Sequence, residues 1–476
     1  MEAALTSGHI VGMVSTFLLI VGFGIYAGTR VKEEDDFSGA ARKAGSAVVA
    51  GTIMGTLVGG ASTIGTAQLA FQYGLDGWWF TLGAGIGCLL LGTVMLKPLY
   101  KSNKATIPQY LIDTYGPGIG PIATVFTSLG IFINVIAQGL SAVALLTSIA
   151  HVSTTVALLI SAALVLAYVL AGGLEGTGIV GMIKLSLLYG AVSAAGGIAL
   201  YQFGGVDGIL RAFPERYPWF SLFGRGLSLD LAAGFSLVVG VLSTQTYIQA
   251  VLSARSFKHA RKGALISAFL IPPVGIGGIL VGLFMRAHVA SFPGMKSAEV
   301  LPTFILNYLP PLLGGVALAT LLVAVIGTWA GLTLGISTML TRDLYQWYIG
   351  KEADGKRDLL VQRVLILCLC TLTLLVVNSS AGGLILGFSF LSMGLRGCTA
   401  LFPLLGAMFF RHQVTPAAGI WAALLGPLTN VIWQSLFPEG LDPLYPGLLV
   451  SGVVLFVVSR FGRRNPQGKA RPGFDC

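Results

Sequence analysis

Long runs of apolar residues, separated by short polar links, follow one another along almost the whole chain. A bilayer core needs about 20 apolar residues per helix, and windows of that size predict thirteen helices, with ends uncertain by several residues. The pattern therefore predicts an all-α polytopic membrane protein with about 13 transmembrane helices. They lie near 7–28, 45–73, 78–97, 118–149, 153–172, 178–201, 229–254, 262–287, 314–341, 358–378, 384–410, 414–437 and 444–460.

Two of these runs are interrupted by small and polar residues. Gly59 and Gly60 lie near the middle of the apolar run 51–74, and the run 229–254 contains Gly240, Thr244 and Gln245. A helix in lipid cannot leave its backbone N–H and C=O groups unpaired, so a break is tolerated only beside a cavity or a bound solute. Transporters bind ions and substrates at such breaks. The alternative for the first run is a glycine-rich face for close helix packing.

Composition and charge agree with a membrane protein and indicate its orientation. The chain is 55% hydrophobic and 10% charged, with a mean hydropathy of +0.83, whereas soluble domains carry about 25% charged residues. Thirteen helices place the termini on opposite sides. With the N-terminus outside and the C-terminus inside, 21 Lys and Arg residues fall in inner segments and 5 in outer ones, as the positive-inside rule requires. The net charge of +10 is therefore a topology signal, and no nucleic-acid partner is expected.

The interrupted runs divide the chain into two groups of five helices. Residues 45–202 form the first group, and residues 203–411, which include a long outer loop, form the second. Because five is odd, the second group enters the membrane from the opposite side, as in an inverted repeat with a site at the bilayer midplane. Residues 1–44 supply one preceding helix and the first cytoplasmic loop, and 412–476 supply two more helices and a basic tail.

Three stretches carry a resemblance to a known family. They are GGASTIGTAQLAFQYGLDGWWF (59–80), STQTYIQAVLSARSFKHARKG (243–263) and ATLLVAVIGTWAGLTLGISTMLTRDLYQ (319–346). In this order and at these helices, they resemble the sodium:solute symporter family, which has a LeuT-type core of five plus five helices. The resemblance implies a secondary active transporter of the plasma membrane rather than an enzyme. It implies alternating-access symport of a small organic solute, coupled to sodium.

The resemblance also implies a sodium site between the first and eighth core helices. Laid on this chain, the ligands would be the carbonyl groups of Gly55, Val58 and Ala324 and the hydroxyl of Thr328. Several neutral oxygens suit a hard, singly charged cation. The alternative for Thr328 is a hydroxyl bonded back to its own helix.

The chain departs from the family at this site. Gly327 stands where sodium-coupled members usually carry a second hydroxyl, and Gly181 stands where they tend to carry an Asp. Lys184 follows one turn after Gly181. Some amino-acid transporters of the same fold place a Lys amine at the sodium position and couple to protons, so we hypothesise that Lys184 replaces or weakens the sodium site. The alternative is that Lys184 extends to the nearby cytoplasmic interface.

The substrate clues centre on Arg396, in the middle of the tenth core helix. No Asp or Glu lies deep within a predicted helix to pair with it, and an anionic ligand would relieve a buried cation. A half-helix N-terminus at the first break would also favour a carboxylate. The expected substrate is therefore a small organic anion or zwitterion, unless Arg396 only donates to nearby carbonyl groups. The candidate contacts are Gly59, Gly60, Ser62, Thr244, Gln245, Phe388 and Arg396.

Two other classes of function compete with transport. An intramembrane enzyme would need a constellation of catalytic or metal-ligating side chains at membrane depth, and the sequence offers none. A sensor that kept the fold and lost transport stays possible because the hydroxyl and the Asp are missing. The sequence does not fix the oligomeric state.

Overall fold

The computed structural model is built almost entirely of helices. It describes residues 5–28, 44–102, 107–170, 179–213, 217–345, 348, 355–379, 382–437 and 440–462. Within these ranges the only β-type pairing is a single bridge between Ala44 and Ala254. The helices before the long outer loop are α1 (Ser7–Gly28), α3 (Ser46–Leu57), η1 (Ala61–Gly65), α4 (Thr66–Tyr73), η2 (Gly74–Trp78), α5 (Trp79–Leu90), η3 (Leu91–Met95), α6 (Leu96–Lys101), α7 (Ile107–Tyr115), α8 (Ile119–Ala150), α9 (Thr154–Leu170) and α10 (Ile179–Gln202).

The second half contains the same kinds of element. Short helices occupy the links 203–228 and 288–313, and most of the remaining helices are long and apolar. They are α11 (Val206–Ala212), α12 (Leu227–Ser243), α13 (Gln245–Leu252), α14 (Phe257–Ala287), η4 (Val289–Ser291), η5 (Ser297–Glu299), α15 (Val300–Tyr308), α16 (Pro311–Met339), η6 (Leu340–Tyr345), α18 (Gly355–Ser379), α19 (Ile385–Phe409), α20 (Pro416–Leu436) and α21 (Leu444–Phe461).

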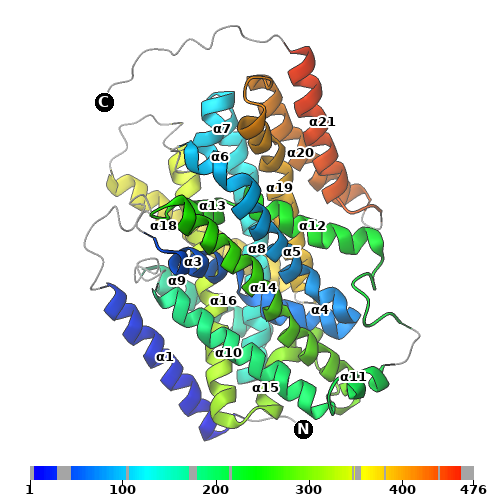
Figure 1. Ribbon diagram of the computed structural model, residues 1–476. Coiled ribbons are helices and arrows are strands. Elements are labelled where there is room, and N and C mark those ends of the chain that lie inside the picture. Colours follow the sequence, from blue (N-terminus) through cyan, green and yellow to red (C-terminus); the bar gives the residue numbers. More distant parts are fainter. Residues whose placement is uncertain are drawn as a thin grey trace.

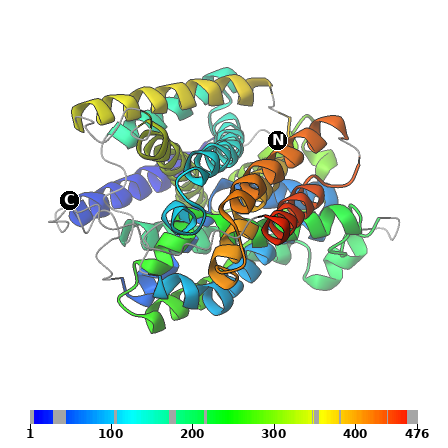
Figure 2. The same ribbon diagram turned by 90° about the horizontal axis from the view of Figure 1, so that it is seen from above.

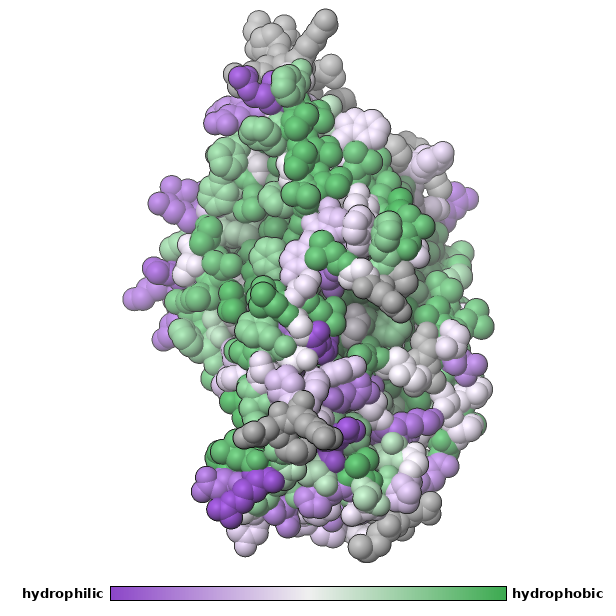
Figure 3. Space-filling model, turned by 90° about the vertical axis from the view of Figure 1, so that its right-hand side faces the viewer, coloured by the Kyte–Doolittle hydropathy of each residue, from purple (hydrophilic) through white to green (hydrophobic). Residues whose placement is uncertain are grey.

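Nine helices of the described part are long and apolar enough to cross a membrane. A tenth span is formed by α12 and α13, which meet at an angle of 50°, and three further apolar helices are shorter. Figure 3 shows a broad apolar surface on one side of the molecule, with hydrophilic residues gathered mainly toward its two ends. Each of the thirteen predicted ranges overlaps at least one helix, but their exact count and the orientation of the termini stay predictions.

The long helix α8 runs through the middle of the bundle. Seen along the bundle, α8 is surrounded by other helices, while α18 lies along one edge (Figure 2). Its most apolar stretch is 89% buried, against 22% for α18 and 28% for α21. Within the bundle α8 packs mainly against α16 and α19. Polar side chains on α8 are therefore shielded from lipid and face other helices.

Glycines allow α1 to pack directly on α16, as Figure 1 shows at one edge of the bundle. A β-carbon on Gly315 of α16 would overlap the backbone carbonyl of His9, and one on Gly12 of α1 would overlap that of Leu312. The two backbones therefore touch, with no side chain between them. Small residues at helix interfaces serve this purpose in membranes.

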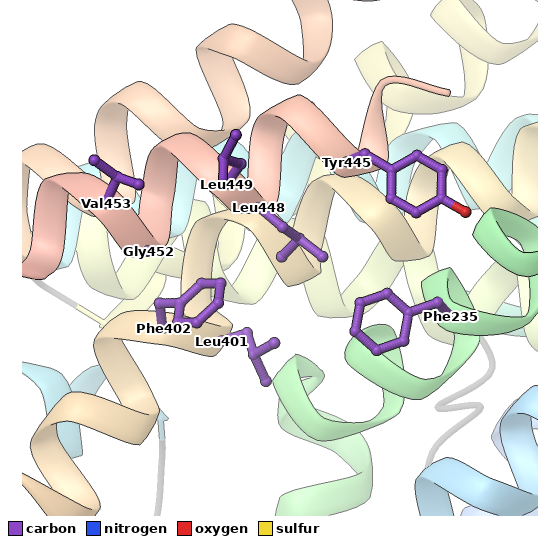
Figure 4. A pocket seen from close by; sticks show the side chains of 8 residues that line it. All are labelled: Phe235, Leu401, Phe402, Tyr445, Leu448, Leu449, Gly452 and Val453. Carbon is purple, nitrogen blue, oxygen red and sulfur yellow. The ribbon is translucent and has the colours of Figure 1, made fainter. Parts of the chain in front are cut away.

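An apolar pocket opens between α12, α19 and α21 (Figure 4). Its volume is about 450 Å³, and eight residues line it: Phe235, Leu401, Phe402, Tyr445, Leu448, Leu449, Gly452 and Val453. Several of them, including Phe235 and Leu449, are largely exposed on the outside of the bundle. The pocket thus belongs to the outer surface and is separate from the polar residues of the two breaks.

The contact between α1 and α16 gives a test of the fold. Replacing Gly315 by Ala should lower the free energy of unfolding by about 1–3 kcal/mol, because overpacking forces backbone shifts. Gly335 lies on the same helix, and a β-carbon there would meet no atom within 4 Å. Gly335→Ala is therefore the matched control and should be neutral or slightly stabilising. Thermal unfolding of the purified variants in detergent measures both, and equal melting temperatures would contradict the packing described.

Candidate functional site

The first long helix is broken at Val58–Gly60, where the sequence predicted it. Val58 has φ −91° and ψ 95°, and the helix resumes as the π-helical turn η1. The free groups at the break find partners: the Gly59 N–H donates to Ser62 Oγ (3.0 Å), and the Ser62 hydroxyl donates to the Gly59 carbonyl (2.9 Å). Gln138 of α8 accepts from the Gly60 N–H (3.1 Å). A side chain from another helix thus completes the break.

The glycines bring the neighbouring helices very close to this break. A β-carbon on Gly60 would lie 2.5 Å from the Ser141 side chain of α8, and one on Gly59 would lie 2.9 Å from Thr328 Oγ1 of α16. The close-packing alternative is therefore also realised here. Chain reversal is not the reason, since neither glycine has a positive φ.

Two of the four groups that the family resemblance assigned to sodium meet at Lys184. Its Nζ donates to the carbonyl oxygens of Gly55 on α3 and Ala324 on α16, both at 3.3 Å. Thr328 Oγ1 donates to the Ala324 carbonyl at 2.8 Å, which is the back-bonded geometry given above as its alternative. Val58 lies at the break, one turn after Gly55. The Lys184 ammonium therefore points inward, between α3 and α16, instead of extending to the interface.

The ammonium of Lys184 also lies beside the gap that Gly327 leaves. A β-carbon on Gly327 would be 3.9 Å from Lys184 Nζ and 3.9 Å from the Tyr168 hydroxyl. A hydroxyl-bearing residue at position 327 would thus approach the ammonium closely. The two departures from the family pattern, a lost hydroxyl and a gained Lys, meet at one place.

Arg396 lies at the second break, where α12 passes into α13. Its Nη1 donates to Thr244 Oγ1 (3.0 Å), its Nη2 to Ser392 Oγ (2.9 Å) and Met393 Sδ (3.1 Å), and its Nε to the Ser392 carbonyl (3.2 Å). Thr244 in turn donates to the Gly240 carbonyl at 2.6 Å. The residue is 1% exposed, and among the described side chains no carboxylate lies within ion-pair distance of it. Only neutral acceptors hold this cation.

Gln245 and Phe388 lie apart from this network. Gln245 Oε1 accepts from the Ile107 N–H at 2.7 Å, at the first residue of α7. Phe388 is a partly buried member of the apolar core on α19. Of the expected substrate contacts, the structure thus brings Ser62 together with Gly59 and Gly60, and Thr244 together with Arg396.

A polar stripe on α8 connects the two breaks. Gly130, Asn134 and Gln138 follow at intervals of four residues, so they share one face over about 12 Å. The Ser392 hydroxyl donates to the Gly130 carbonyl (2.6 Å), Ser389 Oγ donates to Asn134 Oδ1 (3.5 Å), and Gln138 meets Gly60. The sequence interpretation missed Asn134 and Gln138. Two carboxamides spaced i, i+4 in an otherwise apolar helix were the available signal.

Gln68 in α4, the second half of the first broken helix, connects this helix to two other elements. Its Nε2 donates to Ser297 Oγ of η5 (3.2 Å) and to the Gly383 carbonyl (3.3 Å), and its Oε1 accepts from the Ile385 N–H (2.9 Å) at the start of α19. Sequence alone did not single out this residue, because its partners are more than 200 positions away.

Two buried acids lie around Arg225. Arg225 Nη2 is 2.6 Å from Asp230 Oδ1, and its Nε is 3.4 Å from Asp76 Oδ2; both carboxylates are fully buried. The Arg225 guanidinium also lies about 6 Å from the ring centres of Tyr73 and Phe390. Asp230 falls in the first turn of α12 and Asp76 in the short turn η2, so neither acid lies deep within a predicted helix. Neither carboxylate pairs with Lys184 or Arg396 among the described contacts.

Comparisons with known proteins agree with this geometry. The sodium:solute symporter family model matches residues 37–426. The sodium/proline symporter of Escherichia coli (strain K12) is 23% identical over 474 residues, which cover 94% of this chain and 91% of that protein. The human high affinity choline transporter 1 is 25% identical over 398 residues. That match covers 75% of this chain. This chain spans 66% of the length of the choline transporter.

The fold has solved counterparts. A Na⁺-coupled sialic acid symporter in a substrate-bound outward-open state superposes with a TM-score of 0.76 at 16% identity, over 96% of this chain and 98% of that one. The structure of Mhp1, a nucleobase-cation-symport-1 family transporter, superposes with a TM-score of 0.55 at 12% identity. These likenesses confirm the LeuT-type fold. With the match over 37–426, they establish that this integral membrane protein belongs to the sodium:solute symporter family.

Proposed function

We propose that this protein carries a small organic anion or zwitterion across the plasma membrane, with the Lys184 ammonium standing where relatives would bind sodium. The observation that carries the proposal is the pair of 3.3 Å contacts from Lys184 Nζ to the carbonyls of Gly55 and Ala324. An ammonium supplies the same single positive charge to the same oxygens. Uptake would then be coupled to protons or independent of an ion gradient.

The ammonium and a sodium ion would exclude one another. Two unit charges 4 Å apart repel by roughly 4 kcal/mol at an effective dielectric constant of about 20. A buried Lys can lose its proton, because burial disfavours its charged form. Protonation and deprotonation of Lys184 would thus fill and empty the cation position between α3 and α16. This is the role that the coupling ion plays in a symporter.

Sodium coupling is the second candidate, and two observations favour it. Family membership supports it, and the Thr328 hydroxyl remains beside the Ala324 carbonyl. Sodium could bind to these oxygens only after Lys184 had lost its proton or moved aside.

The chemistry around Arg396 supports an anionic or zwitterionic solute. A guanidinium has five N–H donors, and the contacts of Arg396 use four of them. One Nη1 hydrogen is left without an acceptor among the described residues. Because the partners are all neutral, Arg396 leaves an uncompensated positive charge in the polar centre between the two breaks, which favours an anionic or zwitterionic solute. A sensor without transport remains the alternative that labelled-solute counterflow would exclude.

Uptake into proteoliposomes tests the coupling. A panel of proline, pyruvate and sialic acid in counterflow first identifies a transported carboxylate. Its uptake should persist when sodium is replaced by choline, and it should rise as the outside is acidified, since protons then drive Lys184 toward its charged form. Loss of uptake without sodium at every pH would rule out the role of Lys184.

The cation position can be tested without any solute. In the native protein, exchange of choline chloride for sodium chloride should leave the melting temperature unchanged. In Lys184→Ala, sodium should raise the melting temperature by several degrees, because ligands of the folded state stabilise it by mass action. Lys258→Ala, on an exposed stretch of α14, is the control and should behave as the native protein. A sodium-dependent shift in the native protein would favour the second candidate.

Replacing Arg396 by Gln tests the solute class. The variant keeps a polar side chain at the second break but removes the positive charge, so transport of a carboxylate should fall to background. Arg363→Gln, on the exposed face of α18, is the matched control and should transport normally. Unchanged uptake by Arg396→Gln would show that the guanidinium only supports the break.

A further inference from the structure

The carboxamide of Gln138 occupies the place where the broken helix would receive an anion. The turn of π-helix and the helix α4 that follow Gly60 direct their free N–H groups toward the break, and such an N-terminus attracts negative charge. The Gly59 N–H is already taken by Ser62, a neighbour in the same segment. The Gly60 N–H is taken by Gln138 Oε1 from α8, at 3.1 Å. The partial negative charge at this end thus comes from a neutral amide.

The other end of the same carboxamide has no partner. Gln138 is 2% exposed, and its Nε2 makes no hydrogen bond to any described residue. Asn134, one turn away on the same face and 9% exposed, uses only its Oδ1, in a 3.5 Å contact with Ser389. Neither amide nitrogen is among the fully buried polar atoms that lack a partner, so each keeps accessible surface through which an acceptor can approach. Two such donors on one face of α8, next to the break, point to an acceptor that arrives from outside the chain.

We propose that Gln138 is the resident occupant of an anion position at the first break and that a solute carboxylate displaces its oxygen. The carboxylate accepts from the Gly60 N–H, while the released amide turns so that its Nε2 donates to the solute, together with the Asn134 Nδ2. This inference rests on the proposed transport function and specifies which groups of the protein recognise the solute carboxylate.

Exchange of one occupant for another has a consequence for the unloaded protein. A broken helix with an unpaired N–H in an apolar bundle would be unstable, since lipid offers no replacement. Gln138 removes that cost while the site is empty. Because its oxygen is neutral, a carboxylate makes a stronger, charge-assisted bond and can replace it. A neutral solute without a strong acceptor would not bind the Gly60 N–H more strongly than Gln138 does. Gln138 therefore makes the site selective for carboxylates.

The variant Gln138→Glu makes the occupant permanent. A carboxylate fixed at this position should bind the Gly60 N–H and repel any solute carboxylate, because two like charges side by side are unfavourable. We expect the affinity for the carboxylate identified by counterflow to fall by about 100-fold or more, and the melting temperature without solute to stay level or rise. Gln202→Glu, at an exposed position at the end of α10, makes the same change away from the site and should leave affinity unchanged.

A second measurement separates a blocked site from a damaged one. If the fixed carboxylate of Gln138→Glu stands in for that of the solute, the variant should bind the decarboxylated amine counterpart, such as pyrrolidine for proline, which the native protein should not bind. Thermal shift and isothermal calorimetry with proline, alanine, pyrrolidine and ethylamine measure this reversal of preference. Amine binding by Gln138→Glu with loss of carboxylate binding supports the proposal.

Two results would overturn it, in different ways. Native affinity of Gln138→Glu for the carboxylate would show that Gln138 does not hold the anion position, while the transport function would stand. A variant that keeps its melting temperature but binds neither carboxylates nor amines would also overturn the exchange of occupants. If the native protein itself neither binds nor transports any carboxylate, the proposed function fails first.

Discussion

The structure depends on one constraint, that peptide groups released inside a bilayer must find new partners within the protein. At the first break Ser62 and Gln138 take the N–H groups of Gly59 and Gly60, and Lys184 takes the carbonyl of Gly55. At the second, Thr244 binds the Gly240 carbonyl and in turn accepts from Arg396. Each break is therefore stabilised by a side chain from a distant helix. These partners belong to the same group of five helices as the break that they serve, and the two groups are joined by the contacts of Lys184 with the Ala324 carbonyl and of Ser392 with the Gly130 carbonyl.

Much of this could be predicted because hydropathy and glycine act locally. Apolar length gave the helices, and Gly59 and Gly60 gave the first break within a residue or two, since two adjacent glycines weaken an apolar helix at that point. The family resemblance assigned Gly55 and Ala324 to one site, and Lys184 Nζ contacts the carbonyls of both; their role as sodium ligands stays a prediction. The direction in which Lys184 points could not be predicted. Its side chain is long enough to extend either to the membrane interface or to the Gly55 carbonyl.

What the sequence missed are contacts between residues far apart in the chain. Gln138 is 78 positions from Gly60, and Arg225 joins Asp76 across 149. Their importance comes from the packing of α8 and of the outer loop, which no local pattern encodes. Gln245 gives another example, because its place beside a break predicted a solute contact, whereas the sequence did not indicate that its oxygen accepts from the Ile107 N–H, 138 positions away.

The single amide of Gln68 also constrains how α4 can move relative to α19 and η5. Its oxygen is bound to the first residue of α19, and its nitrogen is shared between η5 and the Gly383 carbonyl. Movement of α4 away from η5 and α19 would break all three hydrogen bonds together. Loss of any one bond would free the Gln68 amide to leave the orientation that the other two bonds require. Separation of α4 from η5 and α19 should therefore be all-or-none, so this end of the bundle should have two conformations and no stable intermediate.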